Sequence, residues 1–170
     1  MRYRLLLLFL ASCLIGCTSV TEKNDAFELY LVRHAEKELD AGRDPELTRE
    51  GHHRAETIAA WLLDKNIKDV WSSDYKRTRS TAEPLANRSN LDLQIYDPRK
   101  LNMLAERLIE NHHNAFVVGH SNTTPDLARL LCNCEIEDMD ESEYDRIIVI
   151  SVLDGKTRVE TIRQTALTAH

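Results

Sequence analysis

The chain has 170 residues and a formal net charge of −6 at pH 7, and 42% of its residues are hydrophobic and 29% charged. This length fits one domain rather than two, and the composition excludes both a disordered chain and a bundle of membrane-spanning helices. An acidic chain without a basic run lacks the cationic surface that nucleic acids bind, so we expect no nucleic-acid partner.

The N-terminal segment has the pattern of a targeting sequence. Arg2 and Arg4 precede an unbroken apolar run that is too short to span a membrane, as in a secretory signal peptide. Residues 14–17, with the sequence LIGC, resemble the lipobox of bacterial lipoproteins, which implies lipidation of Cys17. We therefore expect a lipoprotein signal peptide over residues 1–16 and a lipidated polar tether over residues 17–26. The alternative is ordinary cleavage nearby, with Cys17 unmodified.

The lipobox resemblance also implies a location in the cell. Thr18, rather than an aspartate, follows the cysteine. In a Gram-negative cell the resemblance then implies a cell-envelope lipoprotein, held on the outer membrane through its lipid anchor and facing the periplasm. Several acyl chains on one cysteine hold a protein on a membrane stably, whereas one chain does not.

From residue 27 onward, strand and helix patterns alternate. Helical spacing of apolar residues predicts helices within residues 48–65, 76–86 (interrupted by Pro84) and 101–108, and a fourth helix that begins with Thr124 as its N-cap and Pro125 in its first turn. Strands are predicted at residues 27–33, 70–73, 91–95, 115–119, 146–153 and 157–164, the last two joined by an Asp154-Gly155 turn. Residues 27–170 thus form one α/β domain, a mostly parallel sheet flanked by helices on both faces.

Two features near the predicted fourth helix have less specific interpretations. Cys132 and Cys134 are too few ligands for zinc, and we expect a structural or labile pair at the end of a helix, although so tight a ring strains disulfide geometry. The acidic stretch 135–145 (EIEDMDESEYD) is predicted to be a solvated loop.

Candidate functional residues directly follow three predicted strands. Arg33 and His34 come after the first, Arg77 after the second, and His120 after the strand at residues 115–119. In α/β sheets, ligands bind outside the carboxyl ends of the strands, so these side chains should converge. Such a group suits a phosphate, because guanidinium groups bind its oxygens in pairs and an imidazole can attack phosphorus.

The other histidines lack this placement. Two adjacent pairs have no acidic or cysteine partner at metal-ligand spacing, so we expect no metal site and interpret them as helix-surface residues: His52, His53, His112 and His113.

Four sequence blocks carry a family resemblance. Residues 31–35 (LVRHA), 72–82 (SSDYKRTRSTA) and 117–122 (VVGHSN) resemble, in order, three signature blocks of the histidine phosphatase superfamily, the phosphoglycerate-mutase-like proteins. Leu47, Thr48 and Gly51 also fit the start of the first helix in that family. The resemblance extends over residues 27–164 and implies a phosphoglycerate-mutase-like fold.

The resemblance also implies roles for individual residues. His34 would be the nucleophile, with its second ring nitrogen held by a backbone carbonyl, and it would form a phosphohistidine that water hydrolyses. Arg33 and Arg77 would clamp the phosphoryl oxygens, and His120 would be the second histidine of the pocket. These side chains would supply the charge that a metal otherwise supplies, so no metal or cofactor is expected. By its spacing, Arg79 is expected on the helix surface.

Two further positions each allow a functional and a structural interpretation. Lys37 stands where many family members have a small hydroxyl residue, and it either contacts phosphate or is a solvated loop lysine. Asn122 either donates a hydrogen bond to the phosphate or shapes the turn.

The general acid has no matching position. Larger members of the family place a glutamate after the second block, in a segment without a counterpart here. Asp97, at a strand end, is the first candidate, and Glu36, beside the nucleophile, is the second. Either would need a raised pKa to hold a proton near neutrality.

Together these features predict a metal-independent phosphatase at the periplasmic face of a membrane, hydrolysing phosphomonoesters or phosphohistidine. Its partner would be a phosphorylated small molecule, an envelope glycan or a phosphoprotein. The short chain favours the small phosphohistidine phosphatases over the mutases. One alternative is a lipoprotein that binds phosphorylated ligands without turnover, and a phosphotransferase or mutase is the other.

Overall fold

The computed structural model describes residues 26–39 and 42–167. The expected signal peptide, Cys17 and the tether up to residue 25 lie outside the described residues. None of the helices in the described ranges is both long enough and apolar enough to cross a membrane.

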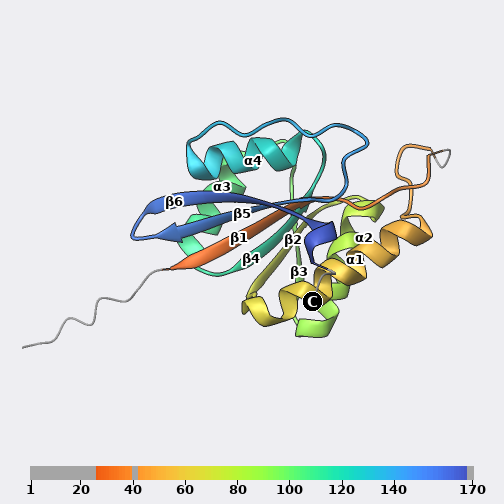
Figure 1. Ribbon diagram of the computed structural model, residues 1–170, viewed down its shortest axis with the longest axis horizontal. Helices are drawn as coiled ribbons and strands as arrows, with labels where there is room; N and C mark the ends of the chain where they lie inside the picture. Colours follow the sequence, from red (N-terminus) through yellow and green to blue (C-terminus); the bar gives the residue numbers. More distant parts are fainter. Residues whose placement is uncertain (1–25, 40–41, 168–170) are drawn as a thin grey trace, which may run out of the picture.

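The described residues form a six-stranded sheet in the order β3-β2-β4-β1-β5-β6 (Figure 1). Parallel pairing joins the first four strands of this order, whereas β5 pairs antiparallel with β1 and β6 antiparallel with β5. This confirms the predicted mostly parallel sheet. The strands are β1 (Phe27–Arg33), β2 (Asp69–Ser73), β3 (Leu93–Tyr96), β4 (Ala115–Gly119), β5 (Arg146–Leu153) and β6 (Lys156–Arg163).

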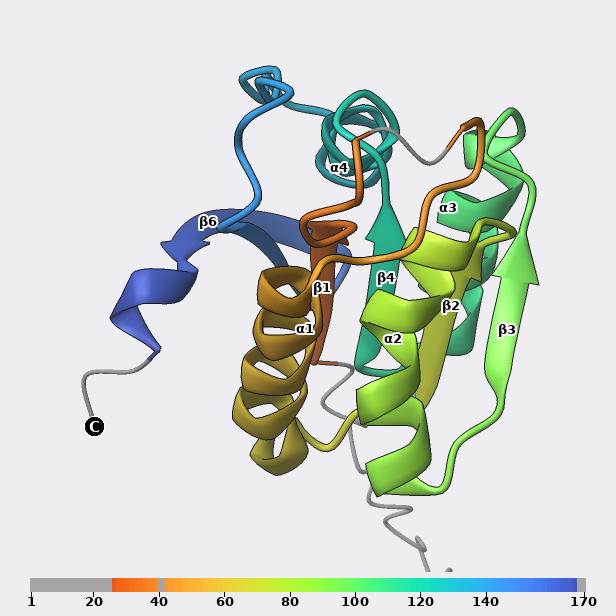
Figure 2. The same cartoon turned by 90° about the vertical axis from the view of Figure 1, so that its right-hand side faces the viewer.

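Four α-helices cover the two faces of the sheet. They are α1 (Arg49–Leu62), α2 (Lys76–Ser89), α3 (Leu101–Asn111) and α4 (Thr123–Cys132). The first two lie on one face and the last two on the other (Figure 2). Along β1, Leu29 and Leu31 pack with the α3 and α4 cluster, and Tyr30 and Val32 with the α1 and α2 cluster. Since both faces are covered, β1 reads as a nearly continuous apolar run.

The start of α1 is fixed against the loop that follows β1. Thr48 caps the helix, because its hydroxyl accepts a hydrogen bond of 3.1 Å from the Gly51 amide. Gly51 packs on the backbone of Glu36, where an added Cβ would lie 2.2 Å from the carbonyl oxygen. This contact requires glycine, and it holds the segment that carries the predicted nucleophile.

Two predicted helix boundaries were wrong. Helix α2 continues through Pro84 to Ser89 instead of being interrupted. Buried residues on both sides of the half-buried proline, Ala82 and Leu85, pack into the core, and this packing outweighs the lost backbone hydrogen bond. Helix α4 begins at Thr123, with Asn122 as its N-cap, so it starts before the predicted position.

The last two strands form the predicted hairpin. Asp154 and Gly155 both have positive φ, 50° and 72°, as the tight turn requires. The open question about the two neighbouring cysteines is also answered, because Cys132 and Cys134 form a disulfide at the end of α4.

Candidate active site

Five of the predicted site residues approach one another at the carboxyl ends of β2, β4 and β1, which are neighbours in the sheet: His34, Lys37, Arg77, His120 and Asn122. They border a cleft of about 350 Å³. The cleft is lined by His34, Lys37, Tyr75, Arg77, Pro98, Arg99, His120, Ser121, Asn122, Thr123 and Glu141.

His34 is held as a neutral imidazole with one free nitrogen. Its side chain is almost fully buried, and its Nδ1 lies 2.8 Å from the Ala35 carbonyl oxygen. A carbonyl only accepts, so Nδ1 carries the proton and Nε2 keeps its lone pair. Burial, together with the positive charges of Arg33 and Arg77, lowers the pKa of His34 to about 3. This is the state that a nucleophile needs at neutral pH.

The backbone around His34 is tied to two other elements. The His34 amide donates to the Gly119 carbonyl of β4 at 2.9 Å, and the Ala35 amide donates to the Thr81 hydroxyl at 3.0 Å. Thr81 in turn donates to the Arg77 carbonyl at 2.7 Å. The loop after β1 is thereby fixed to β4 and to α2, the helix that carries Arg77.

His120 lies beside His34, with ring centroids 5.6 Å apart. Its Nδ1 is 3.4 Å from an Arg77 Nη2 group and its Nε2 is 2.9 Å from the Ser73 hydroxyl. A guanidinium only donates, so Nδ1 is unprotonated and Nε2–H donates to Ser73. Burial, Arg77 and Arg33 lower the pKa of His120 to about 4, so this ring is neutral as well.

Arginine N–H groups without acceptors surround the histidines. In the part of the chain that the structure describes, four buried side-chain nitrogen or oxygen atoms have no hydrogen-bond partner. Three of them are the Nε atoms of Arg33 and Arg77 and the Nη1 of Arg77. The Arg77 Nη1 atom is 3.6 Å from an Asp44 oxygen, an ion pair longer than a hydrogen bond. Each unsatisfied donor costs about 1–3 kcal/mol. Arg77 lines the cleft, so an anion bound there would satisfy its donors.

Arg33 was expected to hold its guanidinium open for phosphoryl oxygens, but in the structure the guanidinium binds the acidic loop. Its Nη1 donates to the carbonyl oxygens of Asp140 and Glu141 at 3.1 and 2.7 Å, and its Nη2 donates to the Glu141 carboxylate at 2.9 Å. The guanidinium also stacks 4.2 Å from the centre of the Tyr144 ring. Arg33 is not among the residues that line the cleft, and its buried Nε has no hydrogen-bond partner.

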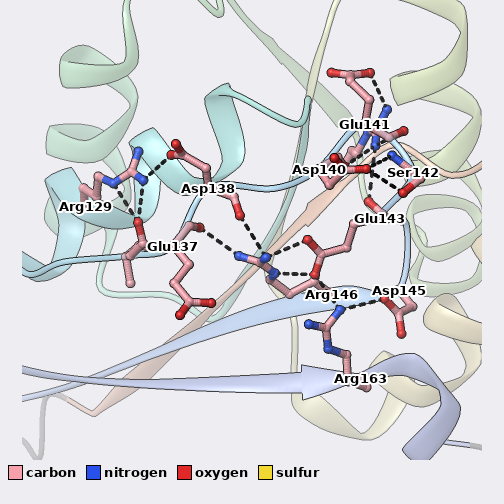
Figure 3. Close-up of polar contacts among 12 residues, drawn as sticks. Arg129, Glu137, Asp138, Asp140, Glu141, Ser142, Glu143, Asp145, Arg146 and Arg163 are labelled. Carbon is pink, nitrogen blue, oxygen red and sulfur yellow. Dashed lines mark hydrogen bonds and ion pairs between the residues drawn. The ribbon is translucent and has the colours of Figure 1, made fainter.

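The acidic loop, residues 135–145, is the mostly solvent-exposed loop that its composition predicts, but it also has specific partners. Arginines bind its backbone and side chains along its length (Figure 3). Besides Arg33, Arg129 donates to the Ile136 carbonyl, and Arg146 donates to the carbonyls of Glu137 and Asp138. The reason is local charge: buried and half-buried guanidinium groups need acceptors, and the loop supplies them.

Neither predicted general acid lies in the cleft. Asp97 accepts two hydrogen bonds from the Arg99 guanidinium, at 2.9 and 3.0 Å, and these hold the pKa of Asp97 down to about 2. For Glu36, burial alone would raise the pKa, but hydrogen bonds from Arg54 outweigh it and lower the pKa. Neither residue lines the cleft. The prediction of an acid at Asp97 or Glu36 is therefore corrected, because each carboxyl lies outside the cleft and pairs there with an arginine.

The remaining predicted residues have clear positions. Lys37 and Asn122 both line the cleft, where a ligand could reach them. Arg79 is exposed on α2 and pairs with Asp74 at 3.1 Å. Within the described ranges, no three histidine, cysteine or acidic side chains form a group that could hold a metal ion.

The sequence argument did not identify several lining residues, namely Tyr75, Arg99, Ser121 and Glu141. Tyr75 and Ser121 lie inside two of the blocks that resemble family signatures, so their positions in those blocks could have indicated them. Glu141 lies in the acidic loop, far from any block, and only the folded chain brings it to the cleft.

The chain is similar in sequence to known protein families over part of its length. A family model described as histidine phosphatase superfamily (branch 1) matches residues 29–101. A probable phosphoglycerate mutase of Serratia proteamaculans is 37% identical over 94 residues, which is 49% of this chain and 43% of that protein. Human 6-phosphofructo-2-kinase/fructose-2,6-bisphosphatase 4 is 46% identical over 63 residues, 34% of this chain and 13% of that protein. The chain thus spans less than half the length of these relatives.

Solved structures share the fold over most of the chain. The protein histidine phosphatase SixA, complexed with tungstate, has a TM-score of 0.67 at 20% identity, covering 84% of this chain and 100% of that one. A mycobacterial glucosyl-3-phosphoglycerate phosphatase has a TM-score of 0.64 at 16% identity, covering 81% and 98%. Over residues 29–101 the chain is thus similar in sequence to the histidine phosphatase superfamily, and it shares the fold of these solved structures.

Proposed function

We propose that the protein is a phosphatase that hydrolyses phosphomonoesters or phosphohistidine through a phosphohistidine on His34. One observation carries the proposal: the cleft is lined both by Arg77, which has two buried nitrogen atoms without a hydrogen-bond partner, and by His34, a neutral histidine with a free nitrogen. The donors suit a phosphoryl group, and the free Nε2 suits an attack on its phosphorus.

The proposed reaction has two steps. The Nε2 lone pair of His34 forms a bond to phosphorus while the bond to the leaving oxygen or nitrogen breaks. Water then attacks phosphorus, and the electrons of the P–N bond return to Nε2. Arg77 offsets the charge on the phosphoryl oxygens during the transfer, and the positive charge of Arg33 adds to this effect from behind His34.

The alternatives have different support. Among the relatives is a probable phosphoglycerate mutase, but the chain spans less than half of that protein. A phosphate-binding lipoprotein without turnover is favoured by one observation, the absence of both predicted acids from the cleft. The phosphatases among the structural neighbours support hydrolysis, since the chain spans nearly their whole length.

The test uses a soluble form that begins at Thr18. We expect hydrolysis of an aryl phosphate in the presence of EDTA, loss of activity and of the phosphoenzyme in His34→Ala, and a loss of about 10²-fold or more in Arg77→Ala. Arg79→Ala, on the same helix but paired with Asp74 at the surface, is the matched control and should retain activity. A phosphoenzyme that forms on the wild type but never turns over would support the binding protein instead.

We also propose that Cys17 carries a lipid anchor that holds the domain on the periplasmic face of the outer membrane. The signal-like segment and the LIGC sequence support this proposal. Phosphorylated small molecules, envelope glycans and phosphoproteins are the substrate classes that such a position offers.

A further inference from the structure

Glu141 is the single carboxylate among the described residues that line the cleft. One of its oxygens accepts from Arg33 Nη2 at 2.9 Å, and the other accepts from the Ser121 hydroxyl. Ser121 directly follows His120, the second histidine of the site. The carboxylate therefore stands at the mouth of the phosphoryl site, whereas Asp97 and Glu36 are held outside it.

Contacts of the residues before and after Glu141 fix the backbone of the acidic loop at the cleft. Arg33 Nη1 binds the Asp140 and Glu141 carbonyls, and the Asp140 side chain accepts from the Ser142 amide at 2.8 Å. Further along, Arg146 binds the Glu143 carboxylate (Figure 3). The side chain of Glu141 itself is exposed, so its carboxylate can move while the backbone stays fixed.

We propose that Glu141 transfers the proton of the leaving group, an inference that rests on the proposed phosphatase function. In the first step the Glu141 carboxylic acid gives its proton to the leaving alkoxide as His34 Nε2 bonds to phosphorus and the P–O bond breaks. In the second step the resulting carboxylate takes a proton from the attacking water as the P–N bond breaks. Both groups then return to their starting states, and the products are an alcohol and hydrogen phosphate.

The charge around Glu141 changes when a phosphoryl group binds. In the empty cleft, the hydrogen bond from Ser121 and the charges of Arg33 and Lys37 lower the pKa of Glu141, while partial burial and Asp140 oppose them. A bound phosphoryl group interacts with the same two cations, Arg33 and Lys37, and so weakens their effect on Glu141. It also places negative charge beside the carboxylate. Both effects raise the pKa of Glu141, so substrate binding brings it a proton.

The experiment compares two substrates with different leaving groups in wild type and Glu141→Gln. An alkyl phosphate, glycerol 3-phosphate, needs a proton on its leaving oxygen, whereas 4-nitrophenyl phosphate does not. We expect kcat/KM to fall about 10²-fold for the alkyl phosphate and by much less for the aryl phosphate, because general acid catalysis contributes about 10²–10⁴-fold. The aryl phosphate should also show a burst, because the phosphohistidine still forms but hydrolyses slowly.

Two control variants separate proton transfer from loop structure. Asp97→Asn removes the carboxyl outside the cleft and should leave the ratio of the two kcat/KM values unchanged. Glu143→Gln removes loop contacts to Arg146 and Arg163 without touching the cleft, and it too should keep that ratio.

Equal losses on both substrates in Glu141→Gln, or the same change of ratio in Glu143→Gln, would overturn the inference and leave the phosphatase function intact. A wild type that hydrolyses neither substrate and forms no phosphohistidine would overturn the proposed function, and the role of Glu141 with it.

Discussion

At the scale of single residues, burial decides the protonation of the site. His34 and His120 are adjacent rings beside two arginines, and both have pKa values well below that of a free histidine. A neutral pair leaves the positive charge of the site on the guanidinium groups, which cannot lose their protons. Burial and the same two arginines thus keep His34, the proposed nucleophile, unprotonated.

This protonation state predicts a pH dependence of stability. The pKa of His34 is about 3 in the folded chain, against about 6.5 when unfolded. As the pH falls below 6.5 the unfolded state binds the proton first, so the free energy of unfolding decreases, by about 1.5 kcal/mol for this residue between pH 6.5 and 5. When the free energy of unfolding is measured with urea across that range, it should depend less steeply on pH in His34→Gln than in wild type. An identical slope in both proteins would mean that His34 is protonated in the folded state too.

At the scale of elements, the site depends on how α1 and α2 meet the loop after β1. Thr81 of α2 binds the Ala35 amide, and Gly51 of α1 lies on the Glu36 backbone. These two contacts fix the segment between β1 and α1 from both helices. His34 owes its position to this packing as much as to the strand that precedes it.

Gly51→Ala should therefore destabilise the protein. The new Cβ would meet the Glu36 carbonyl oxygen at 2.2 Å, and backbone cannot move aside as a side-chain end does. We expect a loss of about 1–3 kcal/mol in the free energy of unfolding, measured with urea. His53→Ala, at an exposed position of the same helix, is the control and should change stability by less than about 0.5 kcal/mol. A Gly51→Ala protein as stable as this control would show that the loop can retreat from the helix.

At the scale of the whole molecule, one compact α/β domain follows a segment with the features of an export signal. The cleft opens where the parallel strands end, and the proposed anchor precedes β1 along the chain. In the proposed function the domain carries the chemistry, and the anchor determines which phosphorylated molecules are within its reach.

The proposed anchor predicts where the protein is found in a fractionated cell. Wild type should sediment with membranes and need detergent for release, because several acyl chains give stable membrane binding. Cys17→Ser should appear in the soluble fraction, whereas Cys13→Ser, inside the signal-like segment, should fractionate as wild type does. Immunoblots of the two fractions measure this, and membrane association of Cys17→Ser would contradict the lipid anchor.

The sequence by itself determined the α/β class, the strand ends and the pair of histidines, because buried parallel strands and amphipathic helices leave strong local patterns. It also indicated Arg77, because that residue stands in a block directly after a strand. The path of α2 through Pro84 was not predictable, since core packing there outweighs a local rule.

Only the tertiary structure decided which carboxylate reaches the cleft. Asp97 and Glu36 are near the strand ends in sequence, yet Arg99 and Arg54 hold them outside the cleft. Glu141 is more than 100 residues from His34, and it reaches the site because Arg33, buried at the end of β1, binds the acidic loop. Ion pairs between residues far apart in the sequence leave no periodic pattern. The position of such a carboxylate is therefore known only from the folded structure, in which the arginines and their partners are in contact.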